Sequence, residues 1–215
     1  WGFVNINLRP FYAEGSKTIG FEIAEQLDWQ LPDHVVAPVA SGAMFTKIHQ
    51  AFGELVRHGL VDGAIPRLSG AQATGCSPVA EAFERDSFDV RPQRPATIAR
   101  SLAIGNPADG YYALQTARQT GGVIGHVSDD EVVAGIRLLA ETEGVFAETA
   151  GGVTVANLQR FVEQGVVDRG ERVVAVISGN GYKTIEAVEP HLGPTYEITP
   201  ALEDLEARLR GEPTP

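Results

Sequence analysis

The stretch HVVAPVASGAMFTK, residues 34–47, decides the fold. Its apolar run, Val35 to Val39, has the length and composition of a buried β-strand. A turn of small residues, 40–43, follows, and a helical pattern begins directly after the turn. A buried strand, a tight turn and a helix N-terminus can form an anion-binding site, because backbone N–H groups converge there and the helix dipole favours negative charge. The same residues also suit an ordinary strand–helix turn that binds nothing.

Strand-like apolar runs alternate with helical patterns along the rest of the chain. Near-continuous apolar strands between helices are typical of a parallel sheet covered on both faces. The sequence therefore predicts an α/β fold of three layers, αβα, with a mostly parallel twisted sheet. The expected strands are 35–39, 67–71, 122–127 and 172–177, with a short edge strand at 196–198, and the expected helices are 17–29, 46–58, 78–85, 111–120, 128–143, one that follows Gly151–Gly152 and ends near Gln164, and 200–210.

Local signals suggest where several of these helices begin. Ser128, followed three residues later by Glu131, forms a capping box. Ser16 and Thr199 are the expected N-caps of the first and last helices. We divide the chain into a connector or strand over 1–15, an α/β domain over 16–198, and a C-terminal helix and tail over 199–215.

Composition excludes several classes of function. The net charge of −11 argues against a nucleic-acid or anionic-membrane surface, since either needs a basic face. The single cysteine, Cys76, rules out an internal disulfide and fits a reducing compartment, so we expect a cytoplasmic location. No run approaches the roughly 18 apolar residues of a membrane span. The chain starts at Trp1 and not at Met, from which we expect a fragment whose natural start lies upstream.

Some motifs that look functional are better explained in other ways. GSKT, residues 15–18, lacks the glycines of a nucleotide-binding P-loop and follows a turn instead of a buried strand. The five histidines have no metal-ligand spacing, so no metal site is expected. Cys76 has no activating neighbour in the sequence, which favours a buried structural thiol. Glu148 is interpreted as a solvated surface acid, the usual state of an isolated glutamate.

Two expected strands end in turns rich in serine and glycine, at Ser41–Gly42 and Ser178–Gly179. Ligands of open α/β sheets bind beyond the carboxyl ends of the strands. If both turns lie at that edge, they face one cleft. Ser178 is then either a turn-capping hydroxyl or a hydrogen-bonding group aimed at a ring nitrogen.

Six motifs, taken in order, resemble the C-terminal portion of the threonine synthase family, which belongs to the fold-type II pyridoxal phosphate (PLP) superfamily (tryptophan synthase β-like). The resemblance covers nearly the whole chain. Each motif alone is weak, and the ordered set carries the resemblance. The motifs are NLRPFYAEGSKTIGFEIAEQL (7–27), PVASGAMFTKI (38–48), GAQATGCSP (70–78), SLAIGNPADG (101–110), ETAGGVT (148–154) and VISGNGYKT (176–184).

The resemblance implies a set of binding residues. The phosphate of PLP would be bound by backbone amides of the turn at 41–44. Ala40 and Ala43 stand where many relatives have glycine, and a phosphate-binding turn tolerates alanine at positions where φ is negative. A neutral hydroxyl would bond the pyridine nitrogen. The stretch 103–107 would lie near the ring, and arginine with asparagine would hold the phosphate of a phosphorylated amino-acid substrate. The implied cofactor-binding residues are Ser41, Gly42, Ala43, Met44, Ser178 and Gly105, and the implied substrate-binding residues are Arg9, Asn5 and Asn7.

One expected residue is absent. In the family, the lysine that forms the Schiff base with PLP lies in an S-x-K-D motif of the N-terminal half, and none of the three lysines here has that setting. The chain is therefore expected to have no catalytic residue of its own, to be inactive alone, and to need the missing N-terminal half as a partner. The exposed cleft wall would then favour aggregation. Homodimer formation stays open.

The complete enzyme would convert O-phospho-L-homoserine and water to L-threonine and phosphate. Two alternatives remain open from the sequence. The chain could come from another fold-type II enzyme, of the cysteate synthase or threonine dehydratase kind. It could also be a non-catalytic module that binds a phosphorylated ligand.

Overall fold

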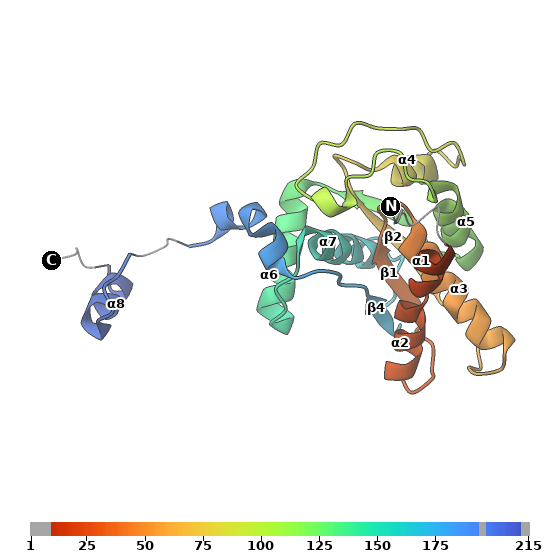
Figure 1. The fold of residues 1–215 in the computed structure, drawn as a ribbon, viewed down its shortest axis with the longest axis horizontal. Helices are drawn as coiled ribbons and strands as arrows, with labels where there is room; N and C mark the ends of the chain where they lie inside the picture. The colour runs from red at the N-terminus through yellow and green to blue at the C-terminus, as the bar shows by residue number, and fades with distance from the viewer. Residues whose placement is uncertain (1–9, 194–196, 212–215) are drawn as a thin grey trace, which may run out of the picture.

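The computed structural model describes residues 10–193 and 197–211, and a four-stranded parallel sheet forms its centre (Figure 1). Strand β1 pairs with β2, Val35 lying opposite Leu68, and with β4, Val36 lying opposite Ala175. The α/β class and the parallel sheet are confirmed. The order is β3-β2-β1-β4, with β1 at His34–Pro38, β2 at Arg67–Ala73, β3 at Ile124–Val127 and β4 at Val173–Ala175.

Helices cover both faces of the sheet, so the predicted three layers are confirmed. Successive side chains of β1 point to opposite faces. Val35 and Ala37 pack in the core beneath helices α2 (Thr18–Gln26), α3 (Ala43–Arg57), α4 (Pro78–Glu84) and α5 (Gly110–Thr120). Val36 packs in the second core, beneath α6 (Asp129–Glu143) and α7 (Thr149–Glu163).

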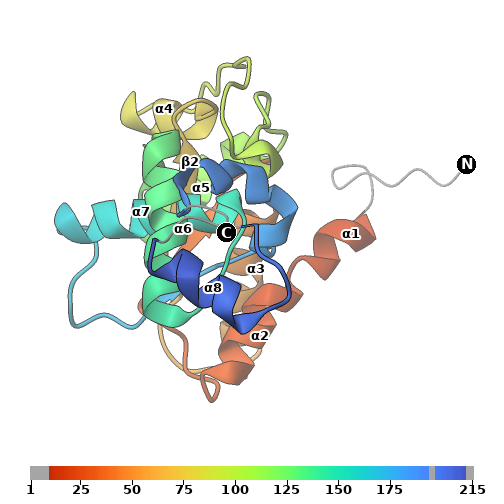
Figure 2. The same cartoon turned by 90° about the vertical axis from the view of Figure 1, so that its left-hand side faces the viewer.

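Smaller elements complete the described chain. Helix α1 (Pro10–Gly15) precedes α2, and a 3-10 turn, η1 (Arg100–Leu102), interrupts the long loop before α5. After β4 come η2 (Gly181–Ala187), η3 (Glu189–His191) and α8 (Leu202–Leu209). Helix α8 lies far from the sheet in Figure 1, and in Figure 2 it is drawn in front of the rest of the molecule.

The N-terminal helices differ from the prediction. Helix α1 occupies part of the stretch expected to be a connector, and α2 begins at Thr18 without the predicted cap. The Ser16 hydroxyl instead donates to the Tyr12 carbonyl, 3.3 Å away, one turn back in α1. The prediction failed because serine hydroxyls bond to nearby carbonyls as readily as they cap helices.

The glycine pair before α7 was also misplaced, since Gly151 and Gly152 lie inside that helix. A Cβ atom on Gly152 would lie 2.4 Å from the Val132 carbonyl oxygen of α6. A Cβ atom on Gly135 of α6 would lie 2.5 Å from the Gly152 carbonyl oxygen. The glycines therefore allow two helices to cross at close range, and they do not form a turn.

The C-terminal predictions were correct only in part. Glu197 and Ile198 have no regular structure where an edge strand was expected, and Tyr196 is outside the described residues. Helix α8 begins at Leu202 with Ala201 as its N-cap, not with Thr199. Thr199 nevertheless donates its backbone N–H and its hydroxyl to the Asp204 carboxylate, at 2.6 and 3.0 Å. The capping box at Ser128 and Glu131 is confirmed.

His34, at the start of β1, makes stability depend on pH. Its side chain is fully buried, and its Nε2 atom lies 2.7 Å from the Ser69 hydroxyl. Burial, aided by the positive charge of Arg67, lowers the pKa of His34 below its ordinary value near 6.5. The folded state therefore holds a neutral imidazole, and the contribution of His34 to stability is complete above about pH 6.5 and is lost as the pH drops below it.

We expect the free energy of unfolding to fall between pH 7 and pH 5, and we expect His34→Gln to flatten this dependence. Denaturant titrations at several pH values measure both. His58→Gln, at the exposed end of α3, is the control and should retain the slope. An unchanged slope in His34→Gln would show that other groups cause the pH dependence.

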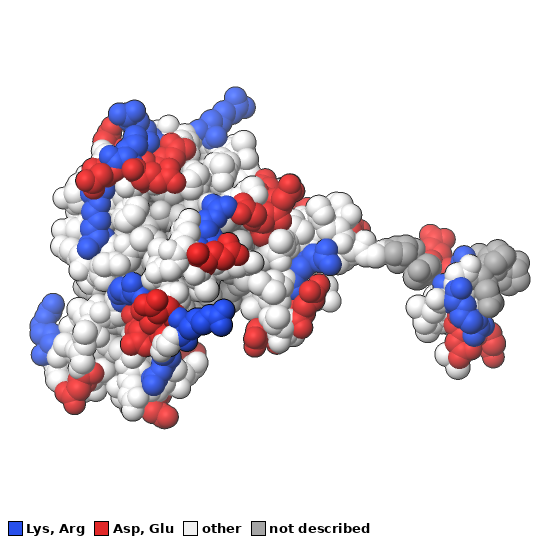
Figure 3. All heavy atoms as spheres, turned by 180° about the vertical axis from the view of Figure 1, so that it is seen from behind, with Lys and Arg blue, Asp and Glu red and all other residues white. Residues whose placement is uncertain are grey.

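The surface mixes charges of both signs. Figure 3 shows acidic and basic side chains interspersed over the back of the molecule. Among the described helices, none is long and apolar enough to span a membrane. Residues 10–193 and 197–211 contain no cluster of three or more His, Cys, Asp or Glu side chains arranged to hold a metal ion.

Candidate active site

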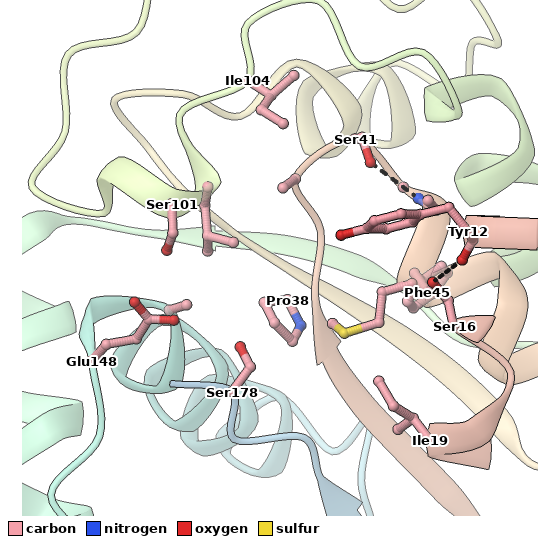
Figure 4. Close-up of a pocket in the computed structure, with 16 residues that line it drawn as sticks. Tyr12, Ser16, Ile19, Pro38, Ser41, Phe45, Ser101, Ile104, Glu148 and Ser178 are labelled. Carbon is pink, nitrogen blue, oxygen red and sulfur yellow. Dashed lines mark hydrogen bonds between the residues drawn. The ribbon is translucent and has the colours of Figure 1, made fainter. Parts of the chain in front are cut away.

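A cavity of about 340 Å³ opens at the carboxyl edge of the sheet. The turn after β1 and the loop after β4 both line it, because these strands are neighbours and run in the same direction. The expectation that the two serine-glycine turns face one cleft is confirmed. In Figure 4, Ser41 and Tyr12 lie on one side of the cavity, and Ser101, Glu148 and Ser178 lie on the other.

The turn after β1 leads into α3 through a glycine that no other residue can replace without strain. Gly42 has φ of +96°, and a Cβ atom there would lie 2.8 Å from the Asp109 carbonyl oxygen. The Asp109 N–H donates to the Ser41 carbonyl at 2.9 Å, so the start of α5 supports the turn from behind. Ala40 and Ala43 do not have positive φ, which explains why alanine is tolerated there.

The first turn of α3 offers donors to an anion. The first amides of any α-helix have no partner within the helix. The Ala43 N–H lies 3.3 Å from the Ser41 hydroxyl, and Met44 and Phe45 follow along the cavity wall. Since α3 is 15 residues long, its dipole adds positive potential at this end. The turn therefore presents backbone donors suited to an anion, and the binding of a phosphate there stays a prediction.

The Ser178 loop is fixed to the start of α7. Residue Ala147 forms an antiparallel bridge with Asn180, and the Glu148 N–H donates to the Gly179 carbonyl at 3.2 Å. A further bond joins the Gly181 N–H to the Phe146 carbonyl at 2.9 Å. These bonds hold the Ser178 hydroxyl on the cavity wall, opposite the turn after β1.

Glu148 corrects the sequence interpretation most strongly. It is not a solvated surface acid: only 3% of the residue is exposed, and it lines the cavity. Its backbone carbonyl accepts the N–H groups of Gly151 and Gly152 as the N-cap of α7, while its side chain extends into the site. The available sequence signal was its position directly before a helix with a glycine-rich first turn.

Three further side chains on the wall were not predicted. Tyr12 and Ser16, from the α1–α2 region, and Ser101, from η1, line the cavity. Lys17 holds this region in place, because its ammonium donates to both carboxylate oxygens of Glu54 on α3, at 2.9 and 3.0 Å. Sequence patterns could not find these residues, since loop contacts join them to the site.

Gly105 and three residues near the N-terminus remain of the predicted site. Gly105 does not line the cavity: its carbonyl accepts the Gln93 N–H at 2.9 Å, and a Cβ atom there would lie 1.8 Å from the Gln93 carbonyl oxygen. Its neighbours Leu102 and Ile104 do line it. The predicted substrate-binding residues, Arg9, Asn5 and Asn7, are outside the described residues.

Neither Cys76 nor any of the three lysines lines the cavity. Cys76 is buried and free, and burial raises the pKa of its thiol, which agrees with a structural role. The lysines all lie within the described residues, and none lines this cavity: Lys17 is paired with Glu54, Lys47 with Glu14, and Lys183 with Glu148.

Comparison with known proteins identifies the ligand class. The model of a family described as pyridoxal-phosphate dependent enzyme matches residues 1–179. The chain belongs to this family of PLP-dependent enzymes. Its cofactor is therefore PLP, and the turn after β1 and the facing hydroxyl suit that molecule. The turn at Gly42, which a Cβ atom would disrupt, has the backbone donors that a phosphate needs. The Ser178 hydroxyl suits the ring nitrogen of PLP.

Curated relatives of this PLP-dependent chain are named threonine synthase. The protein of Methanocaldococcus jannaschii is 40% identical over 182 residues, which cover 84% of this chain and 45% of the relative. That of Bacillus sp. (strain ULM1) is 34% identical over 206 residues, which cover 95% of this chain and 56% of the relative. The chain thus spans about half the length of these relatives. The resemblance drawn from the motifs is confirmed.

Solved structures support the same fold. The processed form of threonine deaminase isoform 2 from Solanum lycopersicum superposes with a TM-score of 0.67 at 20% identity, covering 86% of this chain and 51% of the other. Maize serine racemase superposes with a TM-score of 0.61 at 19% identity, covering 84% and 54%. At these identities the likeness establishes the fold-type II architecture and does not identify a reaction.

Proposed function

We propose that the complete protein containing this chain is a threonine synthase, which converts O-phospho-L-homoserine and water to L-threonine and phosphate. The observation that carries the proposal is the 40% identity to a relative of that name, over a stretch that includes both walls of the cavity. PLP, when bound, supplies the electron-withdrawing chemistry that labilises bonds in an amino-acid substrate.

The residues of this chain bind and orient. The turn at 41–44 donates backbone N–H groups to the cofactor phosphate, and the dipole of α3 adds to the attraction. Ser178 donates its hydroxyl proton to the ring nitrogen. A neutral hydroxyl leaves that nitrogen less positive than a carboxylate partner would, which moderates electron withdrawal by the ring. Arg9, Asn5 and Asn7 hold the substrate phosphate in this proposal, since a guanidinium offers a planar fork.

The lysine that joins PLP to the enzyme comes, we propose, from a part of the protein outside this chain. The three lysines here are paired with acids and do not line the cavity. The chain alone then binds PLP without forming a covalent bond to it and does not catalyse the reaction. We also propose that the complete protein works in the cytoplasm, since a single cysteine fits a reducing compartment.

The test incubates the complete protein with PLP and O-phospho-L-homoserine. Chromatography measures the threonine formed, and a phosphate assay measures the phosphate released. We expect threonine and phosphate in equal amounts. Ser178→Ala should lower kcat about tenfold, which corresponds to one lost hydrogen bond of roughly 1.4 kcal/mol. The matched control is Ser87→Ala, in the loop after α4 and away from the cavity lining.

Two results would contradict the proposal. Production of 2-oxobutanoate from threonine, with no threonine made from O-phosphohomoserine, would indicate an enzyme of the dehydratase kind. Binding of PLP without turnover of either substrate by the complete protein would favour a binding module.

A further inference from the structure

A buried carboxylate lies beside the Ser178 loop, and the mechanism above does not use it. The side chain of Glu148 is 4% exposed, and its Oε1 atom lies so close to Gly179 that a Cβ atom there would be 2.2 Å away. Gly179 has φ of +79° and is adjacent to Ser178. The carboxylate therefore lies against the backbone of the loop that presents the Ser178 hydroxyl.

The cation that faces this carboxylate is Lys183, in η2. Its Nζ atom is 3.0 Å from Glu148 Oε2, while 60% of its side chain is exposed. The pair is asymmetric, since the acid is inside the site and the base lies at the surface. Both belong to one framework, because Thr184, next to Lys183, accepts the N–H of Thr149, next to Glu148, at 3.2 Å.

A buried charge without a partner is costly and acts strongly on its surroundings, since the interior screens it poorly. Without Lys183, Glu148 would place a negative charge at the end of the cavity where Ser178 offers a neutral hydroxyl. With Lys183, the two charges largely cancel there. The lysine also contacts the carboxylate on the side of the loop, where Glu148 Oε1 lies against Gly179.

We propose that Lys183 is a positioning residue of the PLP site, which holds Glu148 against the Gly179 backbone and neutralises its charge beside Ser178. It acts through Glu148 and does not touch the cofactor. The inference rests on the PLP site of the proposed function but not on the identity of the substrate.

The test is a double-mutant cycle in the complete protein that contains this chain, with Lys183→Met, Glu148→Gln and the double variant. PLP alone is titrated, and its absorption spectrum and Kd are recorded. Denaturant unfolding without PLP measures stability. Lys183→Arg is the conservative rescue, and Lys47→Met, which removes a lysine paired with Glu14 at 3.7 Å, is the control.

We expect Lys183→Met to weaken PLP binding about tenfold, to shift the absorption spectrum of bound PLP, and to lower the unfolding midpoint, because one buried charge is left unpaired. The double variant should recover most of the affinity, since both charges are gone. Lys183→Arg and Lys47→Met should resemble the unmodified protein.

Three results would overturn the inference. The first is that Lys183→Met leaves the PLP affinity and the absorption spectrum unchanged. The second is that the loss of PLP affinity in Lys183→Met persists in the double variant. Lower stability with normal PLP affinity and spectrum would make the ion pair purely structural. All these readouts are taken without substrate, so failure to form threonine would disprove the proposed reaction and leave this inference standing.

Discussion

Gly42→Ala is expected to weaken PLP binding by roughly 100-fold, the largest loss expected from any one methyl group in the site. The added Cβ atom would lie 2.8 Å from the Asp109 carbonyl oxygen, and φ of +96° is strained for any residue except glycine. To relieve the close contact and the backbone strain, the turn would have to move away from α5. The converging N–H groups at the start of α3 would then no longer meet one phosphate.

The measurement is the Kd for PLP, by absorbance or fluorescence titration, in the complete protein. Gly53→Ala is a matched control in the same helix, because the nearest atom to its Cβ would be Ile65 Cδ1 at 3.8 Å. That variant should bind PLP normally and be slightly more stable, as alanine favours a helix. Equal affinity in Gly42→Ala and Gly53→Ala would mean that the turn is not the phosphate cradle.

Gln72→Leu is expected to destabilise the fold by roughly 3 kcal/mol, or a Tm lower by roughly 6–12 °C. The Gln72 side chain, on β2, is fully buried. Its Oε1 atom accepts the N–H groups of Val79 and Ala80 at 3.0 and 2.9 Å, and its Nε2 atom donates to the Val39 carbonyl at 3.1 Å. Leucine would leave three buried polar groups without these partners.

Thermal unfolding without PLP measures this effect. Gln159→Leu, on the exposed surface of α7, has the same change in chemistry and should alter Tm by little. Because Gln72 also supports the turn that leads to Gly42, weaker PLP binding should accompany the lower Tm. A Tm loss no greater in Gln72→Leu than in Gln159→Leu would contradict the role given to these hydrogen bonds.

The fold could be predicted from the sequence because its signals are local. Apolar strand runs, the capping box at Ser128 and the small-residue turn before α3 depend on neighbours within a few residues. The errors occur where distant contacts override local preference. Gly151 and Gly152 look like a turn, yet both lie inside α7, where Gly152 packs against α6 and Gly151 against Ala147 and Ile177.

The candidate site was predictable in its backbone parts and not in its side-chain parts. Ser41, Gly42 and Ser178 follow strands, and parallel strands bring their carboxyl ends to one edge. Glu148 and Tyr12 have no such signal. Their positions depend on how α7 and α1 pack, and a lone glutamate is exposed more often than it is buried.

The sequence by itself determined the layered α/β architecture, the glycine turn after β1 and the kinship with PLP-dependent enzymes. These properties follow from periodicity, from the backbone freedom of glycine and from an ordered set of motifs. Only the tertiary structure decided that Glu148 is buried, that Lys183 forms an ion pair with it, and that Gln72 caps α4 in place of the neighbouring Ser77. Burial and charge pairing depend on residues far apart in the chain, and no local pattern records those distances.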